Sequence, residues 1–252
     1  MTTHEIGIVE INSDSGNISL RFRKESGTHG DGGELKQIFS DLDYDIFQIP
    51  QGRRLLEYYK NLNGTPLIID AGANIGAATV YFHLTLPNCF CFSIEPNIKN
   101  FQLLEINTQS FKNQINFLGG LASVDGQLGL SDPGTGDMDF RTHTPKENQT
   151  IDLVESICIP TILNHKEVQK KSPLILKIDI EGAEAELFSK DNEWVDEFPL
   201  IIIEPHDWML PFTGSSMNFL KAISKFDFDI ILKKENLFLF NNKILKSQSV
   251  SQ

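Results

Sequence analysis

The chain has 252 residues, of which 40% are hydrophobic, and 34 acidic against 22 basic side chains give a formal net charge of −12. This length allows one large domain or one domain with an appendage, and the apolar fraction is enough for a sizeable core. Nucleic-acid binding needs a basic surface that releases counterions, so the acidic composition without a basic stripe argues against a nucleic-acid substrate. No signal peptide and no long apolar span is evident, which predicts a cytoplasmic protein without a membrane span.

The N-terminal segment is polar and rich in Gly and Ser at its start. Its alternation and turn residues predict a hairpin with strands at 5–10 and 18–22. A helix is predicted at 34–41, a brief strand at 46–48 and a second helix at 53–61. These elements show no core of their own. We therefore expect residues 1–64 to cap the sheet or the active site and not to form an independent domain.

From residue 65 onward, apolar strands alternate with helices up to about residue 245. The predicted strands are 67–69, 89–95, 115–118, 174–179 and 200–204, the helices are 77–82, 98–108, 183–188 and 215–225, and the closing hairpin is 228–232 with 237–240. This alternation predicts an α/β fold with a mostly parallel sheet and right-handed crossovers. The closing hairpin gives the last strand an antiparallel place.

Residues 124–158 interrupt the alternation. They contain two predicted strands, 127–130 and 155–159, and turn signals at Asp125-Gly126 and Pro133-Gly134. We expect an inserted or edge hairpin with a loop that contacts substrate.

The stretch Asp70-Ala-Gly-Ala-Asn-Ile-Gly76 joins the first strand to the first helix of this domain. Glycines permit a tight turn and close approach to the backbone, and the helix start favours a carboxylate or phosphate. Asp70 adds negative charge, so a ligand with both an ammonium and a carboxylate, such as the methionyl end of S-adenosylmethionine, suits this turn. Asn74 breaks the G-x-G-x-x-G pattern of nicotinamide sites, and no Gly-Lys-Ser/Thr follows as in a P-loop.

Acidic residues end the predicted parallel strands. They are Asp70, Glu95, Asp179 and Glu204, and ligands of such sheets bind beyond the carboxyl ends of the strands. Glu95 follows Gly76 by 19 residues (95 − 76), close to the spacing of the ribose-binding acid in dinucleotide folds. Its carboxylate can accept from both ribose hydroxyls.

Four motifs together resemble the FkbM-type methyltransferases, over roughly residues 65–210. They are the glycine turn, Ser93-Ile-Glu-Pro-Asn97, Leu176-Lys-Ile-Asp-Ile-Glu-Gly-Ala-Glu184 and Ile203-Glu-Pro-His206. The resemblance implies an S-adenosylmethionine-dependent O-methyltransferase with the Rossmann-like seven-stranded class I sheet. Carried over by position, the cofactor-binding residues are Asp70, Gly72, Asn74, Gly76, Glu95, Pro96, Ala122 and Ser123.

Methyl transfer requires an aligned acceptor oxygen and removal of its proton, and a positioned base typically adds about 10²–10⁴-fold. The resemblance and the strand-end position place Asp179 near the transferred methyl, with His206 as a second candidate base and Glu181 behind them. A structural histidine at 206 and a helix-start role for Glu181 remain open. The same three side chains could hold a divalent cation such as magnesium, an alternative that we do not favour.

Trp208, Met209 and Phe212 follow His206 in an apolar loop, where they could stack on an acceptor ring or belong to the core. The acceptor itself is predicted to be a small molecule, a sugar or secondary metabolite with a free hydroxyl. A carboxyl O-methyltransferase of a peptide or natural product and a non-catalytic S-adenosylmethionine-binding module are the alternatives.

The three cysteines are Cys89, Cys91 and Cys158. Because Cys89 and Cys91 lie two residues apart in a predicted strand, we expect them on opposite faces, without a disulfide and without zinc spacing. The expected role is that of small buried hydrophobes in a reducing compartment.

Overall fold

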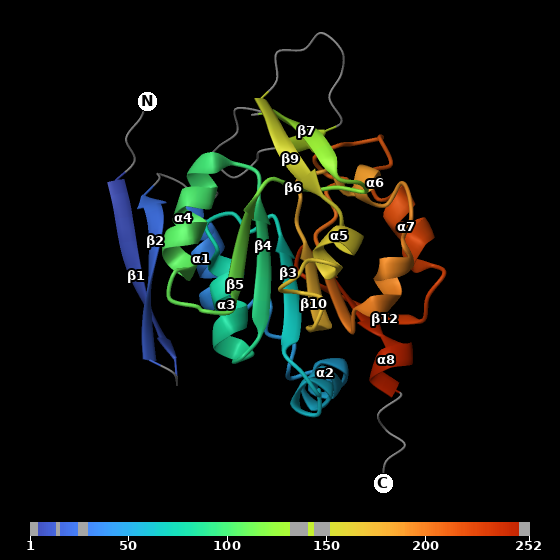
Figure 1. Ribbon diagram of the computed structural model, residues 1–252, viewed down its shortest axis with the longest axis horizontal. Helices are drawn as coiled ribbons and strands as arrows, with labels where there is room; N and C mark the ends of the chain where they lie inside the picture. The colour runs from blue at the N-terminus through green and yellow to red at the C-terminus, as the bar shows by residue number, and fades with distance from the viewer. Residues whose placement is uncertain (1–4, 14–15, 25–29, 132–140, 144–151, 247–252) are drawn as a thin grey trace.

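The computed structural model describes residues 5–13, 16–24, 30–131, 141–143 and 152–246. At its centre is a seven-stranded sheet in the order β12-β13-β11-β10-β3-β4-β5 (Figure 1). The strands are β3 (Pro66–Ala71), β4 (Phe90–Glu95), β5 (Gln114–Leu118), β10 (Ser172–Ile178), β11 (Leu200–Ile203), β12 (Phe228–Lys233) and β13 (Asn236–Asn241). Parallel pairing runs from β5 to β11, and β13 is antiparallel to both of its neighbours. The predicted Rossmann-like class I sheet with an antiparallel C-terminal hairpin is confirmed.

Helices cover both faces of the sheet, which explains why the parallel strands are apolar throughout. Along β3, Leu67 and Ile69 belong to one buried cluster and Ile68 to the other, as the two-residue period of a strand requires. One face carries α1 (Asp31–Phe39), α2 (Pro50–Lys60), α3 (Ala77–Thr85), α4 (Ile98–Thr108) and α8 (Asn242–Lys246). The opposite face carries α5 (Ile159–Leu163), α6 (Glu184–Leu187), the 3-10 helix η1 (Glu193–Glu197) and α7 (Met217–Ile223).

The N-terminal segment packs directly on this domain. The hairpin β1 (Glu5–Ser13) and β2 (Gly16–Lys24) lies beside α4, and Asn107 of α4 hydrogen-bonds both backbone groups of Arg21 (Figure 1). Leu20, Leu35 and Leu55 join the core cluster on the α3 face of the sheet. The brief strand predicted at residues 46–48 is wrong, because these residues turn into α2, where Pro50 occupies the first helical turn.

The insert forms more than the predicted hairpin. The strands β6 (Gly120–Leu121), β7 (Gly126–Ser131), β8 (Arg141–His143) and β9 (Asp152–Ile157) make a second sheet in the order β6-β9-β7-β8. The strand predicted at 155–159 begins earlier and ends at Ile157, because Cys158 caps α5 and Pro160 lies in its first turn. Parts of the insert, residues 132–140 and 144–151, lie outside the described residues.

The expectation that Cys89 and Cys91 point to opposite faces is wrong. Side chains at positions i and i+2 of a strand share a face, and the two Sγ atoms are 3.6 Å apart. Both thiols are buried and free, as expected.

No helix in the described part of the chain is long and apolar enough to cross a membrane.

Candidate active site

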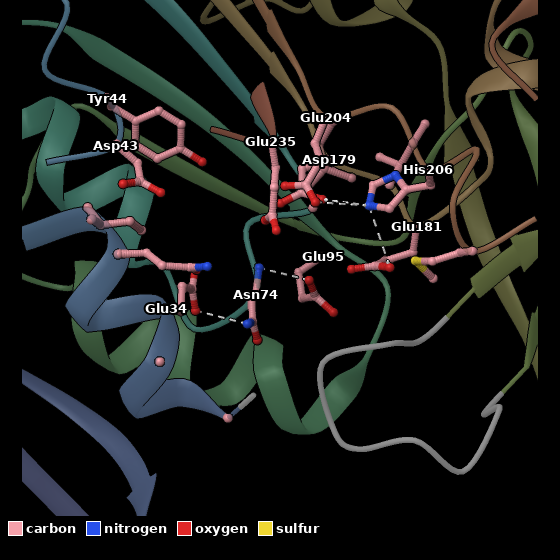
Figure 2. Close-up of a pocket in the computed structure, with 18 of the residues that line it drawn as sticks. Glu34, Asp43, Tyr44, Asn74, Glu95, Asp179, Glu181, Glu204, His206 and Glu235 are labelled. Atoms are coloured by element: carbon pink, nitrogen blue, oxygen red, sulfur yellow. Dashed lines mark hydrogen bonds and ion pairs between the residues drawn. The ribbon is translucent and has the colours of Figure 1, made fainter. Parts of the chain in front are cut away.

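A cavity of about 680 Å³ lies beyond the carboxyl ends of β3, β4, β10 and β11 (Figure 2). The sheet domain contributes to its wall Gly72, Asn74, Glu95, Pro96, Asp179, Glu181, Glu204 and His206, and the N-terminal segment contributes Glu34, Asp43 and Tyr44. The cavity therefore lies where the parallel sheet predicts a ligand site, and the N-terminal segment covers one side of it.

The glycine turn between β3 and α3 forms the floor of the cavity. Gly72 has φ +75°, and a Cβ there would lie 1.7 Å from the carbonyl oxygen of Asp179, so only glycine lets the turn pack against the end of β10. Asn74 has φ +47°, in the left-handed region that asparagine tolerates better than other side chains. Gly76, with φ +88°, lies below the turn against Leu104 of α4 and does not line the cavity.

Glu95 ends β4 and is held by amide donors. Its Oε2 accepts from the Asn74 backbone N–H at 2.9 Å, and its Oε1 accepts from the Asn97 N–H at 2.8 Å and from Asn100 Nδ2 at 3.3 Å. Burial raises the pKa of this carboxyl to about 7, although these hydrogen bonds and the charge of Lys177 lower it. The carboxyl group thus lies against the glycine turn, ready to accept further hydrogen bonds from a ligand in the cavity.

Asp70 does not reach the cavity. Its side chain is fully buried, accepts from Thr79 Oγ1 at 2.6 Å and pairs with Lys177 Nζ at 3.1 Å. Lys177 also donates to the Gly72 carbonyl at 3.0 Å and lies 3.5 Å from Asp179 Oδ2. Burial lowers the pKa of Lys177, but the charges of Asp70 and Asp179 outweigh it and hold the pKa well above its usual range. Lys177 thus connects the buried Asp70 to the glycine turn.

His206 connects the acids at the ends of β10 and β11. Its Nδ1 is 2.8 Å from Glu184 Oε1, whereas its Nε2 faces Asp179, Glu181 and Glu204 at 3.6, 3.7 and 3.6 Å (Figure 2). Burial lowers the pKa of His206, but the hydrogen bond to Glu184 and the nearby carboxylates raise it to about 9. In this arrangement the imidazole is mostly protonated at neutral pH, which does not favour it as a general base. Glu181 adopts φ +54°, so a strained backbone directs this carboxylate toward the cluster.

The N-terminal segment completes the wall with side chains that the sequence prediction missed. Glu34 of α1 accepts from Asn74 Nδ2 at 2.9 Å, which ties α1 to the glycine turn (Figure 2). Burial raises the pKa of Glu34 well above its usual range, and burial likewise raises the pKa of Tyr44. Lys177 was also missed, but the sequence does carry a signal for it. A lysine in an apolar strand would be buried, and because a buried charge without a partner is costly, it predicts an acidic partner nearby.

Ala122 and Ser123 lie outside the cavity wall. Ala122 is buried and its N–H donates to the Ile157 carbonyl, and the Ser123 hydroxyl donates to Glu186. Their assignment to the cofactor stays a prediction, as do those of Asp70 and Gly76. Trp208 and Met209 do line the cavity, and Trp208 and Phe212 are 71% and 106% exposed, so these two rings are not core residues.

A family model described as the methyltransferase FkbM domain matches residues 70–235. No curated protein matches the chain.

Several solved structures align with the chain at low sequence identity. The methyltransferase FkbM of Methylobacillus flagellatus aligns with 83% of this chain at 16% identity and a TM-score of 0.48, and the chain spans 60% of its length. The precorrin-6y C5,15-methyltransferase of Geobacter metallireducens aligns with 75% of this chain and 84% of its own at 12% identity, with a TM-score of 0.39. TrmK of M. capricolum, solved with S-adenosyl-homocysteine, aligns over 74% of this chain and 66% of its own length at 13% identity, with a TM-score of 0.35.

Proposed function

The chain belongs to the FkbM methyltransferase family, and we propose that it is an S-adenosylmethionine-dependent methyltransferase that methylates a hydroxyl oxygen of a sugar or secondary metabolite. The observation that carries this proposal is the position of Asp179. Its side chain lies in the cavity wall between two cationic groups, Lys177 and His206, and its carbonyl touches the glycine turn. A carboxylate in that place can accept the proton of an acceptor hydroxyl.

We assign the cofactor to the floor of the cavity. Gly72 and Asn74 would contact its methionyl part, and Glu95 with Pro96 its ribose and adenosine side. S-adenosylmethionine supplies an activated methyl group on its sulfonium, so the chain's own task is to align the acceptor and remove one proton. The many carboxylates around the cavity suit a cofactor with a net positive charge.

Asp179 is the proposed proton acceptor, and His206 positions it. Glu184 fixes His206 from behind at Nδ1, so that the ring presents Nε2 to Asp179 at 3.6 Å. Glu204, whose pKa is raised to about 7 by burial and by the neighbouring Asp179 charge, shares the same imidazole edge. A protonated His206 holds the Asp179 side chain in one orientation through this ion pair.

The exposed rings beside the cavity support an acceptor that is itself a ring compound. Trp208 lines the cavity while most of its surface remains exposed, and Phe212 follows it in the same loop. An exposed apolar patch next to a polar cavity is typical of a binding site. Aromatic faces of this kind stack on sugar or aromatic rings.

A divalent cation is a second way to activate the acceptor. Asp179, Glu181 and His206 offer ligand atoms that all lie within 4.8 Å of one another. The buried Glu184 behind His206 resembles the carboxylates that orient metal-bound histidines. Bound there, a cation would polarise the acceptor oxygen, and EDTA would then abolish turnover, whereas a metal-free mechanism would not respond.

Turnover of an Asp179→Asn variant tests the proposal. With labelled S-adenosylmethionine and a panel of hydroxyl-bearing sugars and secondary metabolites, the wild type should form S-adenosylhomocysteine and an O-methyl product. Asp179→Asn should lower kcat by about 10²–10⁴-fold with cofactor affinity largely retained. Glu167→Gln, at an exposed position between α5 and β10, is the control and should match the wild type.

Three results would count against this assignment. Normal turnover of Asp179→Asn would remove Asp179 as the base. Methyl esters among the products would indicate a carboxyl acceptor, and tight cofactor binding without turnover on any acceptor would indicate a binding module.

A further inference from the structure

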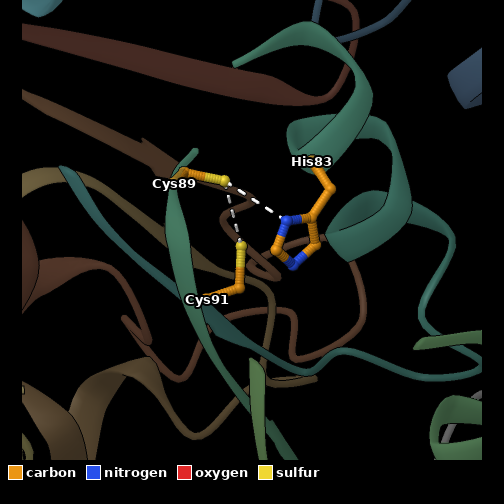
Figure 3. A group of neighbouring side chains, drawn as sticks. All are labelled: His83, Cys89 and Cys91. Carbon is orange, nitrogen blue, oxygen red and sulfur yellow. Dashed lines mark hydrogen bonds between the residues drawn. The ribbon is translucent and has the colours of Figure 1, made fainter. Parts of the chain in front are cut away.

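Three side chains outside the cavity form a compact cluster of thiols and imidazole. His83 of α3 points toward Cys89 and Cys91 at the start of β4 (Figure 3). Cys89 Sγ lies 3.6 Å from Cys91 Sγ and 3.5 Å from His83 Nδ1. None of the three lines the proposed active site, so the methyl-transfer proposal makes no use of them.

The proton on His83 can be placed from its neighbour Gln114. The amide nitrogen of Gln114 has only acceptors around it for its two hydrogens: Ser93 Oγ at 2.9 Å, the Ile115 carbonyl at 3.1 Å and Asn116 Oδ1 at 2.7 Å. Its oxygen therefore faces His83 Nε2, at 2.9 Å. An oxygen there requires a donor, so Nε2 carries the hydrogen and Nδ1 directs its lone pair at Cys89.

A metal-bound histidine has the same arrangement of its two ring nitrogens. A ligating imidazole normally donates its other N–H to an oxygen, which fixes the tautomer and the ring orientation. Phe111 stacks on the His83 ring with centroids 4.0 Å apart and an interplanar angle of 7°, which holds the ring in place. The imidazole is thus fixed with its free nitrogen toward two thiols.

The distances also match a soft metal ion. Metal–sulfur bonds of about 2.3 Å and metal–nitrogen bonds of about 2.0–2.1 Å at a tetrahedral angle place two sulfurs about 3.8 Å apart and sulfur and nitrogen about 3.6 Å apart. The observed separations of 3.6 and 3.5 Å are close to both values. All three ligand atoms lie within 4.8 Å of one another.

We propose that His83, Cys89 and Cys91 bind a soft metal ion of the Zn²⁺ or Cu⁺ class. Thiolate and imidazole donors select these ions over the hard cations that carboxylates prefer. Binding breaks two S–H bonds, forms two metal–sulfur bonds and releases two protons to solvent, with no change of oxidation state. With three protein ligands, the fourth position of a tetrahedral Zn²⁺ would be open to water. His83 is the partly buried member of the three ligands.

The site would clamp two elements of the active-site scaffold together. His83 belongs to α3, which begins at Gly76 of the glycine turn, and Cys91 belongs to β4, which ends at Glu95. A bound ion joins the far ends of both elements. Loading should therefore raise the melting temperature of the protein, because the ion binds the folded state.

Co²⁺ substitution provides a direct test, because thiolate ligation gives an intense near-ultraviolet charge-transfer band that carboxylate ligation does not. The reduced full-length protein is titrated with Co²⁺ and then Zn²⁺, before and after refolding from denaturant so that slow entry is covered. We expect one equivalent of Co²⁺ to produce the band and Zn²⁺ to remove it. A Cu⁺ titration against a chromophoric chelator distinguishes the copper case.

Matched variants assign the band to this cluster. Cys91→Ser should abolish it, with circular dichroism confirming a folded protein, and His83→Gln should weaken ion binding at least tenfold. Cys158→Ser changes the remaining cysteine, which lies at the start of α5, and should leave the band intact. Absence of the band in the wild type under both conditions, with no stoichiometric Zn²⁺ or Cu⁺ bound, would show that the cluster is a hydrogen-bonded part of the core. The methyl-transfer proposal is unaffected by that result.

Discussion

Glu95 is a buried carboxyl group in the wall of the proposed cofactor site. Three amide donors from the glycine turn and the start of α4 surround its carboxyl group, which is only 4% exposed. Burial and hydrogen bonding act on its pKa in opposite directions, and burial prevails. Because burial disfavours the charged form, hydroxyl donors from a ligand would stabilise the carboxylate.

Replacing Glu95 with glutamine should weaken S-adenosylhomocysteine binding by about 10–100-fold, because hydrogen bonds to a charged acceptor contribute about 1.5–3 kcal/mol. The amide also places a donor against the N–H groups that the carboxylate accepts from. Isothermal titration calorimetry at pH 8 measures the change, and Glu105→Gln on the exposed side of α4 is the control. Equal affinity for wild type and Glu95→Gln would exclude Glu95 from the site.

The raised pKa of Glu95 also predicts a pH dependence of stability. Its value in the folded protein, about 7, lies above the usual 4.5, so the neutral carboxyl is favoured on folding. This contribution is complete below pH 4.5 and is lost as pH rises through 7, by on the order of 3 kcal/mol. Denaturant unfolding from pH 5 to 8 should show the ligand-free wild type losing stability relative to Glu95→Gln. A constant difference across this range would contradict the assignment.

At the scale of elements, the turn between β3 and α3 decides the shape of the cavity floor. Its close packing depends on Gly72, which sits against the backbone at the end of β10. The buried Lys177 spans the same two strands by binding the Gly72 carbonyl and Asp70. The turn and the end of β10 therefore behave as one unit, although they are about a hundred residues apart in sequence.

A Gly72→Ala substitution should destabilise the protein by more than about 2 kcal/mol, because overpacking and a disfavoured positive φ act together. Thermal unfolding should show a clearly lower melting temperature and weaker cofactor binding. Gly32→Ala in α1 is the matched control for the melting temperature alone, since a Cβ at Gly32 meets nothing within 4 Å and alanine favours a helix; Gly32 lines the same cavity. A melting temperature for Gly72→Ala equal to that of the wild type would refute this role of the turn.

At the scale of the whole molecule, we propose that residues 1–64 and 65–245 form one folding unit. The N-terminal hairpin and helices bury Leu20, Leu35 and Leu55 in the same cluster as the α3 face of the sheet. They also supply Glu34 and Tyr44 to the cavity wall. The segment therefore contributes both to the core and to the site.

A chain that begins at residue 65 should fail to fold cooperatively, because it would expose the apolar α3 face of the sheet. We expect aggregation or strong binding of a hydrophobic dye, and no binding of S-adenosylhomocysteine. Co-expression with residues 1–64 as a separate chain should partly restore the soluble protein. A monomeric truncated chain with wild-type cofactor affinity would show instead that the sheet domain is independent.

The sequence by itself determined the fold class, because strand and helix periodicity and the order of the motifs are local properties of the chain. The predicted helix at 98–108 matches α4 at both ends, where Asn97 supplies the N-cap, and the antiparallel place of β13 followed from the closing hairpin. Local pattern also placed Glu95, Asp179 and Glu204 at strand ends, and these three residues do line one cavity.

Tertiary structure alone decided which strand-end acids face the cavity and which lie beneath it. Asp70 lies at the carboxyl end of β3 as Glu95 does in β4, yet Asp70 is a buried partner of the distant Lys177. Glu34 and Tyr44 carry no motif, and their place in the wall depends on how the N-terminal segment packs. The cluster of His83, Cys89 and Cys91 likewise needs the contact of a helix with a strand. Such contacts depend on the packing of separate elements, which no local period of the chain encodes.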